Sequence, residues 1–307
     1  MPARLAAAWR DPSPLTARLM LFTAACLWSV GGLLIKEIDT GALNIVFFRC
    51  FFSALLLAPF LRGRRFPTRP DTIVSIIIFA LLLVLFVAAT KETTAANAIF
   101  LQYTAPIWVV VFAPVLIGEH LRRSDAIPLA ICLGGIAVLF AGNWSSGDAA
   151  GLIMGTASGL FFGLYFVWLR RMRYADPVAI TAVSCAGVAL ILLPVPFFSD
   201  LSLESLGLLA VMATFQFAIP YVLFARGIAY VSGTEASLIA LIEPVLNPIW
   251  VALFYGEDPS KATIIGGAVI LFGLGLRYTV FRPPAEEAPL EPAAEAGGGP
   301  LFSGPQG

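Results

Sequence analysis

Residues 234–257 have the sequence TEASLIALIEPVLNPIWVALFYGE, and this stretch decides how the chain must be organised. It is long and apolar, yet Glu243 lies near its middle and Pro244 follows directly. A charge at the centre of a membrane-spanning helix costs roughly 2.5–3.5 kcal/mol on insertion scales. The proline adds a second cost, because it removes a backbone donor that lipid cannot replace. A segment with both features is expected to line a functional site.

The pattern occurs a second time at residues 96–119, which have the sequence ANAIFLQYTAPIWVVVFAPVLIGE. A shift of 138 positions places Pro106 on Pro244 and Gly118-Glu119 on Gly256-Glu257. Both stretches also contain Pro-Ile-Trp. Discontinuous helices in corresponding positions of two repeats are typical of transporter sites. The expected helix breaks, with a role in gating, lie at Pro106, Pro244 and Pro248.

The composition is that of a membrane protein. The chain is 59% hydrophobic and only 12% charged, with a mean hydropathy of +0.89, whereas soluble domains carry about 25% charged residues. Ten apolar runs have about the length that a helix needs to cross ~30 Å of hydrocarbon. We expect spans at about 17–36, 43–61, 72–90, 95–117, 124–142, 150–170, 177–195, 204–225, 234–255 and 261–280.

The placement of charged residues supports ten spans with both termini in the cytoplasm. With that topology, fifteen of the nineteen basic residues lie in inner loops or termini. Outer loops contain only Lys36, Lys91 and Lys261. This bias follows the positive-inside rule. The remaining basic residue is Arg49, which lies within the second span.

The repeat divides the chain into two five-helix halves. We expect a cytoplasmic N-terminal segment at 1–16, a first repeat at 17–142 and a second repeat at 148–281. Because five is odd, the second repeat must be inverted relative to the first. Residues 283–307 are rich in Pro, Ala, Glu and Gly, so we expect a disordered tail. Its last residues, LFSGPQG, are compatible with a tag remnant.

Small residues mark helix contacts within the membrane. Glycines recur every four residues in the sixth span, at Gly151, Gly155, Gly159 and Gly163. Glycines at this spacing allow two helix backbones to approach closely. We interpret them as a packing surface, with a sliding surface for conformational exchange as the alternative.

The candidate site combines few polar groups with many aromatic ones, as small-molecule sites usually do. Ala240, Glu243, Asn247 and Trp250 share one helix face. An amine could bind Glu243 or Asn247, and a carboxylate could bind Arg49. The expected substrate-binding residues are Trp28, Arg49, Asn97, Gln102, Tyr103, Tyr165, Trp168, Gln216, Tyr221, Glu243, Asn247 and Trp250.

Several of these residues have a second interpretation. Glu243 could form a structural ion pair with Arg49, contact substrate, carry a proton, or lie nearer the membrane interface. The amides of Asn97, Gln102 and Gln216 could form hydrogen bonds between helices, and the tyrosines and tryptophans could be interface anchors. The sequence does not decide among these roles.

The chain resembles the drug/metabolite transporter superfamily, and within it the EamA-type exporters. The resemblance rests on ten spans in two inverted halves, the arginine in FFRC (Arg49), the P…GE pattern that closes the fourth and ninth spans, and the glycine-rich fifth and tenth spans. Among such exporters it is most similar to those for aromatic amino acids in bacteria. The resemblance implies a central cavity formed by the first four helices of each half, peripheral fifth and tenth helices, and alternating access. It assigns no role to Glu243.

We therefore expect an all-α polytopic membrane protein that exports small metabolites, above all aromatic or apolar amino acids, across the bacterial inner membrane. The alternative is a multidrug exporter for lipophilic cations. No catalytic cluster, metal site or cofactor motif is present, since the chain has one histidine and one deep acid. The expected partners are a small-molecule substrate and the lipid bilayer, without nucleic acid. Energy coupling and oligomeric state stay open, and a monomer is compatible with the sequence.

Overall fold

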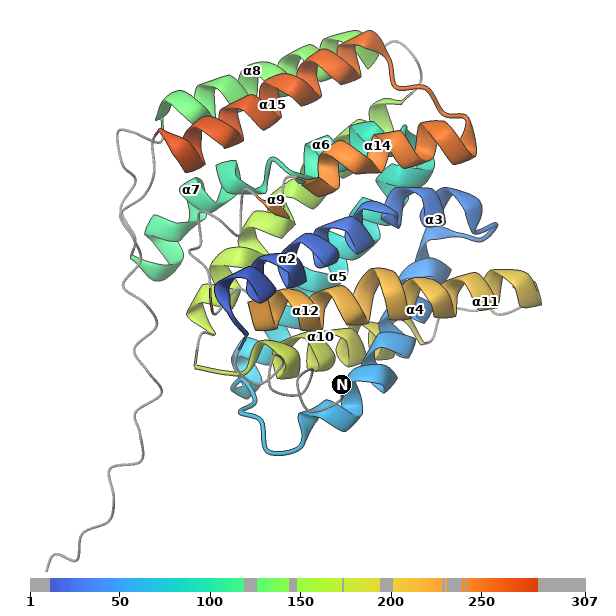
Figure 1. The fold of residues 1–307 in the computed structure, drawn as a ribbon, viewed down its shortest axis with the longest axis vertical. Helices are drawn as coiled ribbons and strands as arrows, with labels where there is room; N and C mark the ends of the chain where they lie inside the picture. Colours follow the sequence, from blue (N-terminus) through green and yellow to red (C-terminus); the bar gives the residue numbers. More distant parts are fainter. Residues whose placement is uncertain are drawn as a thin grey trace, which may run out of the picture.

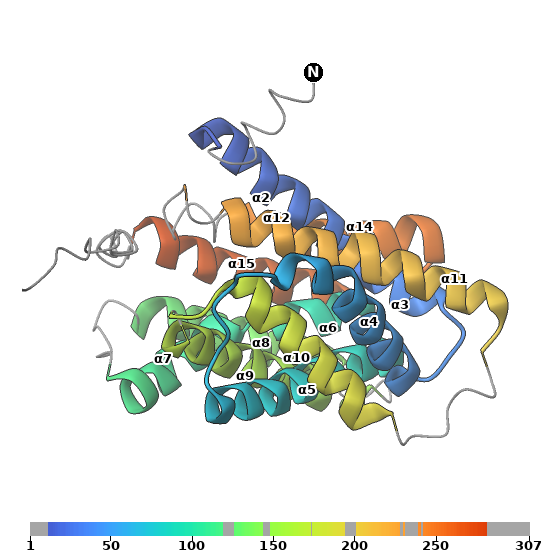
Figure 2. The same ribbon diagram turned by 90° about the horizontal axis from the view of Figure 1, so that it is seen from below.

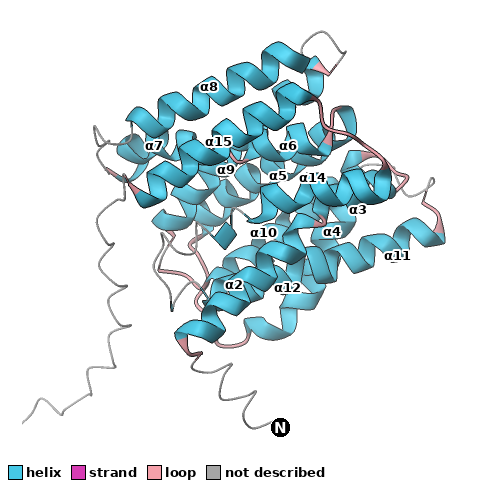
Figure 3. Cartoon of the chain, turned by 45° about the horizontal axis from the view of Figure 1, so that its top comes forward, coloured by secondary structure: helices cyan, strands magenta, loops and turns pink. Residues whose placement is uncertain are grey.

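The computed structural model describes residues 12–118, 126–143, 148–172, 174–193, 201–227, 230, 239–240 and 242–280. These residues form helices and connecting loops, without a strand among them (Figure 3). The first part contains α2 (Pro14–Ser29), α3 (Gly31–Glu37), α4 (Ala42–Leu57), η1 (Ala58–Leu61), α5 (Arg69–Glu92), α6 (Ala95–Gln102), α7 (Ala105–Ile117) and α8 (Ala126–Asn143). The second part contains α9 (Ala149–Arg171), α10 (Pro177–Leu192), α11 (Leu203–Val211), the π-helical segment η5 (Met212–Ala218), α12 (Ile219–Gly227), α14 (Ile242–Tyr255) and α15 (Lys261–Thr279).

The predicted all-helical membrane protein is confirmed, whereas the count of ten spans stays a prediction. Six helices in the described residues are long and apolar enough to cross a membrane, or seven if a bent pair counts as one span. Three shorter apolar helices, Val178–Leu192, Ile242–Tyr255 and Lys261–Leu276, lie within three further predicted runs. The first predicted span consists of α2 and α3, which meet at Val30.

The two GE patterns coincide with helix ends. Gly118 follows α7 with φ 71°, and Gly256 follows α14 with φ 73°. Left-handed backbone at this position favours glycine, because other residues meet a steric penalty at their Cβ. The glycine of the pattern therefore has the same local function in both places, which is to end the helix.

The fourth predicted span is interrupted twice. Helix α6 ends at Gln102 and α7 begins at Ala105, so Pro106 lies in the first turn of α7. There its missing N–H costs no helical hydrogen bond. A bend of 46° follows between Ala95–Val109 and Val111–Ile117. Pro114 explains this bend, because a proline ring collides with the carbonyl four residues earlier.

In the corresponding ninth span, the structure describes residues 239, 240 and 242 onward. Helix α14 begins at Ile242, which places Pro244 in its first turn and Pro248 inside the helix. Residues 239–240 are also helical, so the described helical backbone lies on both sides of position 241 and continues through Glu243. The beginning of the predicted ninth span, at residues 234–238 and 241, lies outside the described residues.

The helices pack so that segments distant in sequence become neighbours. Helices α8 and α15 lie side by side at one edge of the molecule (Figure 1). Helix α9 packs against α5, α6 and α7, and α2 packs against α12 and α14 (Figures 1 and 2). Helix α4 packs against α10 and η5. Leucine, isoleucine, valine and phenylalanine side chains that remain exposed occur on most helices, as expected of a surface that faces lipid.

The glycine face of α9 confirms the predicted packing role. A Cβ at Gly155 would lie 3.1 Å from the Leu101 side chain, and a Cβ at Gly163 would lie 2.6 Å from the carbonyl oxygen of Ala105. At Gly159 the Cβ would meet the carbonyl oxygen of Leu101. Glycine is therefore required for α9 to lie this close to the backbone of α6 and α7.

Equivalent residues of α8 and α15 make equivalent contacts with the other helix. A Cβ at Gly135 would lie 2.7 Å from the carbonyl oxygen of Gly266, and a Cβ at Gly273 would lie 3.2 Å from that of Pro128. The 138-residue shift converts Gly135 into Gly273 and Pro128 into Gly266. The two contacts are therefore equivalent positions of one packing arrangement.

Substitution of Gly159 tests the close approach of α9. Gly159→Ala should destabilise the protein by about 1–3 kcal/mol, since overpacking forces the backbone apart. Gly134→Ala is the matched control, because a Cβ there meets nothing within 4 Å and should be neutral or stabilise by about 0.5–1 kcal/mol. Thermal unfolding in detergent measures both, and equal melting temperatures would contradict the packing described for α9.

Candidate functional site

Glu243 lies where the two proline-containing segments meet. The Tyr103 hydroxyl donates a hydrogen bond to Glu243 Oε2 at 2.8 Å and lies 3.1 Å from the carbonyl oxygen of Ala240. Tyr103 occupies the interruption between α6 and α7, and Glu243 occupies the first turn of α14. A carboxylate can accept several hydrogen bonds, so this one bond leaves capacity for a further donor.

Arg49 lies deep in the structure without a hydrogen-bond acceptor. Its side chain on α4 is 2% exposed, and its Nε and Nη2 atoms have no hydrogen-bond partner. The guanidinium carbon lies 4.8 Å from the centroid of the Phe217 ring on η5. A ring face attracts the cation but does not replace acceptors for its N–H groups. Because a buried charge without such partners is costly, the site favours an anionic group beside Arg49.

Arg49 and Glu243 do not form the ion pair considered from the sequence. No ion pair joins them, although both side chains are described. Their helices have different neighbours: α4 packs against α5, α10 and η5, and α14 packs against α2, α3 and α6. Tyr221 lies within electrostatic range of both groups. Tyr221 therefore lies near both groups, which do not pair with each other.

Aromatic rings occupy the region between the two charges. The ring centroids of Trp28 and Tyr221 are 5.2 Å apart, and those of Tyr221 and Phe217 are 4.8 Å apart. Tyr165 stacks on Phe79 at 4.9 Å, and its hydroxyl has no hydrogen-bond partner. We call Arg49, Glu243 and the rings of Trp28, Phe217 and Tyr221 the charged-aromatic cluster.

Two amides flank the junction of α2 and α3. Gln216 on η5 lies against Gly31, and Asn247 on α14 lies against Gly32. Gln216 Nε2 donates to the carbonyl oxygen of Trp28 at 3.4 Å. The amide oxygens of Gln216 and Asn247 are buried without a donor. These two oxygens are therefore available to a ligand or to water.

Trp250 and Gln102, two predicted site residues, have hydrogen-bond partners on other helices. Trp250 Nε1 donates to Ser29 Oγ at 2.9 Å. Gln102 Nε2 donates to Ser158 Oγ at 3.2 Å. Both contacts lie near the charged-aromatic cluster. Trp250 is on α14, the helix of Glu243, and Gln102 immediately precedes Tyr103, which donates to Glu243.

Asn97 and Trp168 lie in separate contacts. Thr263 Oγ1 donates to Asn97 Oδ1 at 2.7 Å, which joins α6 to α15. Trp168 Nε1 donates to the carbonyl oxygen of Asp71 at 3.1 Å, at the first turn of α5. The structure thus brings Trp28, Arg49, Tyr103, Gln216, Tyr221, Glu243 and Asn247 together around the charged-aromatic cluster and places these two residues in interhelical contacts.

A clamp at one end of the molecule was not predicted as a site. Lys36 Nζ lies 2.8 Å from Glu257 Oε2 and donates to the carbonyl oxygen of Thr93 at 2.7 Å. Ala95 N donates to Glu257 Oε1 at 2.6 Å. We call Lys36, Thr93, Ala95 and Glu257 the terminal clamp. Two features of the sequence could have indicated the terminal clamp: the repeated GE pattern and the scarcity of lysine in the predicted outer loops.

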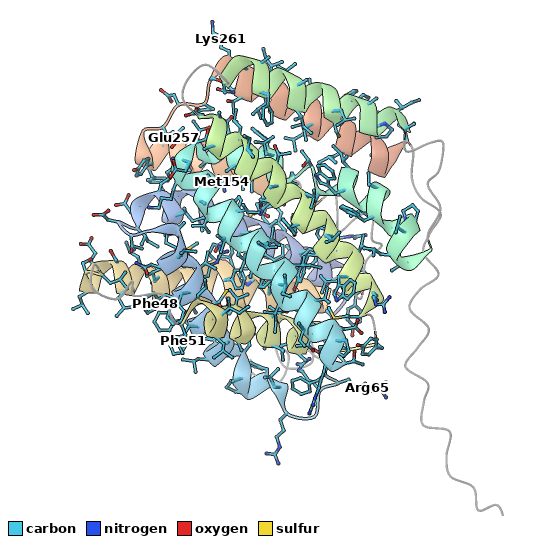
Figure 4. All side chains as sticks on the ribbon, turned by 180° about the vertical axis from the view of Figure 1, so that it is seen from behind. Phe48, Phe51, Arg65, Met154, Glu257 and Lys261 are labelled. Carbon is cyan, nitrogen blue, oxygen red and sulfur yellow. The ribbon has the colours of Figure 1, made fainter. Side chains whose placement is uncertain are left out.

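Other ion pairs lie toward the opposite end. Figure 4 shows Glu257 and Lys261 at one end of the molecule and Arg65 at the other. Arg64 Nη1 lies 2.7 Å from Asp176 Oδ2, and Arg171 Nε lies 3.3 Å from Asp71 Oδ1. Both pairs join the first part of the chain to the second, as the terminal clamp does. Ionic contacts thus connect the two parts near both ends.

Glu257→Gln tests the terminal clamp. The amide can still accept from Ala95 N, but the ion pair with Lys36 is lost, so we expect a loss of about 1–3 kcal/mol in stability. Glu92→Gln is the matched control, because Glu92 is exposed at the C-terminal end of α5. Thermal unfolding in detergent at low and high salt measures both, and equal stability of the two variants would contradict the clamp.

Comparison with known proteins places the chain in a family. The EamA-like transporter family matches residues 15–141 and again residues 149–279. An uncharacterised transporter of Archaeoglobus fulgidus is 30% identical over 256 residues, which cover 82% of this chain and 92% of that protein. The pseudopaline exporter CntI of Pseudomonas aeruginosa is 26% identical over 82% of this chain and 92% of its own length.

The fold is shared with a protein of known structure. A solved crystal structure matches 89% of this chain and 100% of its own, with a TM-score of 0.63 and 20% identity. At this identity the likeness concerns the fold alone. The family match covers most of the chain in two consecutive stretches, and the described helices are those of a multi-pass membrane protein. The chain therefore belongs to the EamA-like transporter family.

Proposed function

We propose that this protein is a secondary transporter that exports small metabolites carrying both a carboxylate and an amine, such as amino acids with aromatic or apolar side chains. The observation that carries the proposal is the charged-aromatic cluster, in which Arg49 lacks an acceptor and Glu243 has one donor, Tyr103. A carboxylate would bind at Arg49, where charge-assisted hydrogen bonds are strong. An amine would share Glu243 with the Tyr103 hydroxyl.

The cluster favours such a zwitterion over a lipophilic cation. A cation would find Glu243 and the rings of Trp28 and Tyr221, which suit it. It would leave the buried guanidinium of Arg49 unpaired, since the acceptors available in the described structure do not reach Nε and Nη2. A carboxylate removes that cost.

Alternating access between two inverted repeats is supported by several observations. The family matches the chain twice, in stretches close to the two predicted halves. The equivalent contacts of α8 with α15 are those that a pseudo-two-fold axis would produce. The interruption between α6 and α7 meets α14 at Glu243, and discontinuous helices are typical of inverted-repeat transporters. In this mechanism the terminal clamp would open to release substrate at its end of the molecule.

Membrane orientation follows from the loop charges. The arginine-rich end, which includes Arg65, would face the cytoplasm, and the end with Glu257 would face outward. Export is further supported by the similarity to the pseudopaline exporter CntI. We propose the bacterial inner membrane as its location, with both termini in the cytoplasm.

Transport by purified protein in liposomes tests this function. Arg49→Gln and Glu243→Gln should each reduce uptake of a labelled amino acid about 10- to 100-fold, since hydrogen bonds to charged groups contribute about 1.5–3 kcal/mol. Arg62→Gln and Glu92→Gln are the controls, because both residues are exposed.

Two outcomes would contradict the proposal. Full activity of both site variants would remove the charged-aromatic cluster from the transport path. Uptake of a labelled lipophilic cation that depends on Glu243 but not on Arg49 would instead support the multidrug alternative. The same liposomes, with and without a pH gradient, would show whether protons are exchanged.

A further inference from the structure

We infer that the carboxylate and the amine of the substrate are set further apart than the two charged groups on a single α-carbon. The inference rests on the proposed function and specifies its substrate class: an elongated zwitterion, with an anionic end, an apolar middle and a cationic end. An α-amino acid carries both charges at one carbon, so we expect it to reach Arg49 and Glu243 together less well than an elongated zwitterion does.

The two charged residues lie on helices with different neighbours. Arg49 lies on α4, which contacts η5, and Glu243 lies on α14, which contacts α2. Helix α2 in turn contacts η5 and α12. Close packing therefore joins α4 to η5, η5 to α2 and α2 to α14, so Arg49 and Glu243 lie on helices at the two ends of this series.

Each charged group has its own aromatic neighbour. The Glu243 carboxylate is bonded to the Tyr103 hydroxyl at 2.8 Å. The Arg49 guanidinium lies over the Phe217 ring at 4.8 Å. Opposite charges attract strongly where water is excluded, yet these two form no ion pair. The two groups therefore occupy separate positions in the described structure, and we expect one bound molecule to reach both.

A series of aromatic rings begins at Arg49. From Arg49 the series continues to Phe217 at 4.8 Å, then to Tyr221 at 4.8 Å, then to Trp28 at 5.2 Å. Trp28 belongs to α2, the neighbour of α14. The rings thus form a continuous apolar surface from the cation toward the acid. An apolar spacer would fit along this surface, and it could carry the charged groups at its two ends.

Binding to the purified protein in detergent tests the inference. The probes are unbranched ω-amino acids of increasing chain length, each compared with the α-amino acid of the same carbon count. The alkanoate and the alkylamine of the same length are the single-charge controls. We expect affinity to pass through a maximum at an intermediate length, where the ω-amino acid binds at least tenfold more tightly than its α-isomer.

The two charged residues should act on opposite ends of the probe. Arg49→Gln should weaken binding of the alkanoate and leave the alkylamine unchanged, and Glu243→Gln should do the reverse. Arg49→Lys keeps the charge, so it should retain alkanoate binding and show that the site has folded. Either single neutral variant should abolish the advantage of the ω-amino acid over the single-charge probes.

The inference would be overturned if the α-isomer bound as tightly as the ω-amino acid or more tightly, and lost its affinity in both neutral variants. It would also be overturned if no ω-amino acid bound. Transport in liposomes separates this result from the proposed function. If α-amino acids are transported at least as well as ω-amino acids and depend on both charges, the inference fails and the function stands. If ω-amino acids bind but no probe is transported, the function fails while the spacing of the charges is supported.

Discussion

Arg49 lies 2% exposed on α4, over the ring of Phe217, and two of its nitrogens lack an acceptor. Glu243, the acid on α14, does not form an ion pair with it. The guanidinium is therefore buried without an anionic partner among the described residues. A buried charge without such a partner costs stability, and a bound carboxylate is the remedy that we propose.

The backbone around the site is shaped by glycine and proline. Helices α6 and α7 are interrupted beside Tyr103, which allows its hydroxyl to reach Glu243. The glycine face of α9 permits these short helices to pack backbone to backbone. Irregular backbone is tolerated at membrane depth only where protein or a water-filled space covers it. The close packing of α9 therefore makes the interruption possible, and the interruption positions the partner of the acid.

Composition and periodicity predicted the all-helical membrane fold, because apolar runs of spanning length are a strong signal. The repeated GE pattern also predicted two equivalent helix ends, at Gly118 and Gly256. The partner of Glu243 was not predictable, since a tyrosine 140 residues away becomes its neighbour only through tertiary packing. For the same reason Asn97 and Trp168 resembled site residues in sequence, whereas their hydrogen bonds join helices. The terminal clamp depends on Lys36 and Glu257 meeting across the two parts of the chain.

The central claim is that Arg49 and Glu243 face one shared binding region from opposite sides. Cysteine accessibility tests it most directly, in a background in which Cys26, Cys50, Cys132 and Cys185 are replaced by serine or alanine. Arg49→Cys and Glu243→Cys would each be exposed to a small water-soluble thiol reagent, with and without a transported substrate. The account predicts that both cysteines react and that the same substrate protects both. Protection of one cysteine without the other, or reaction of neither, would contradict it.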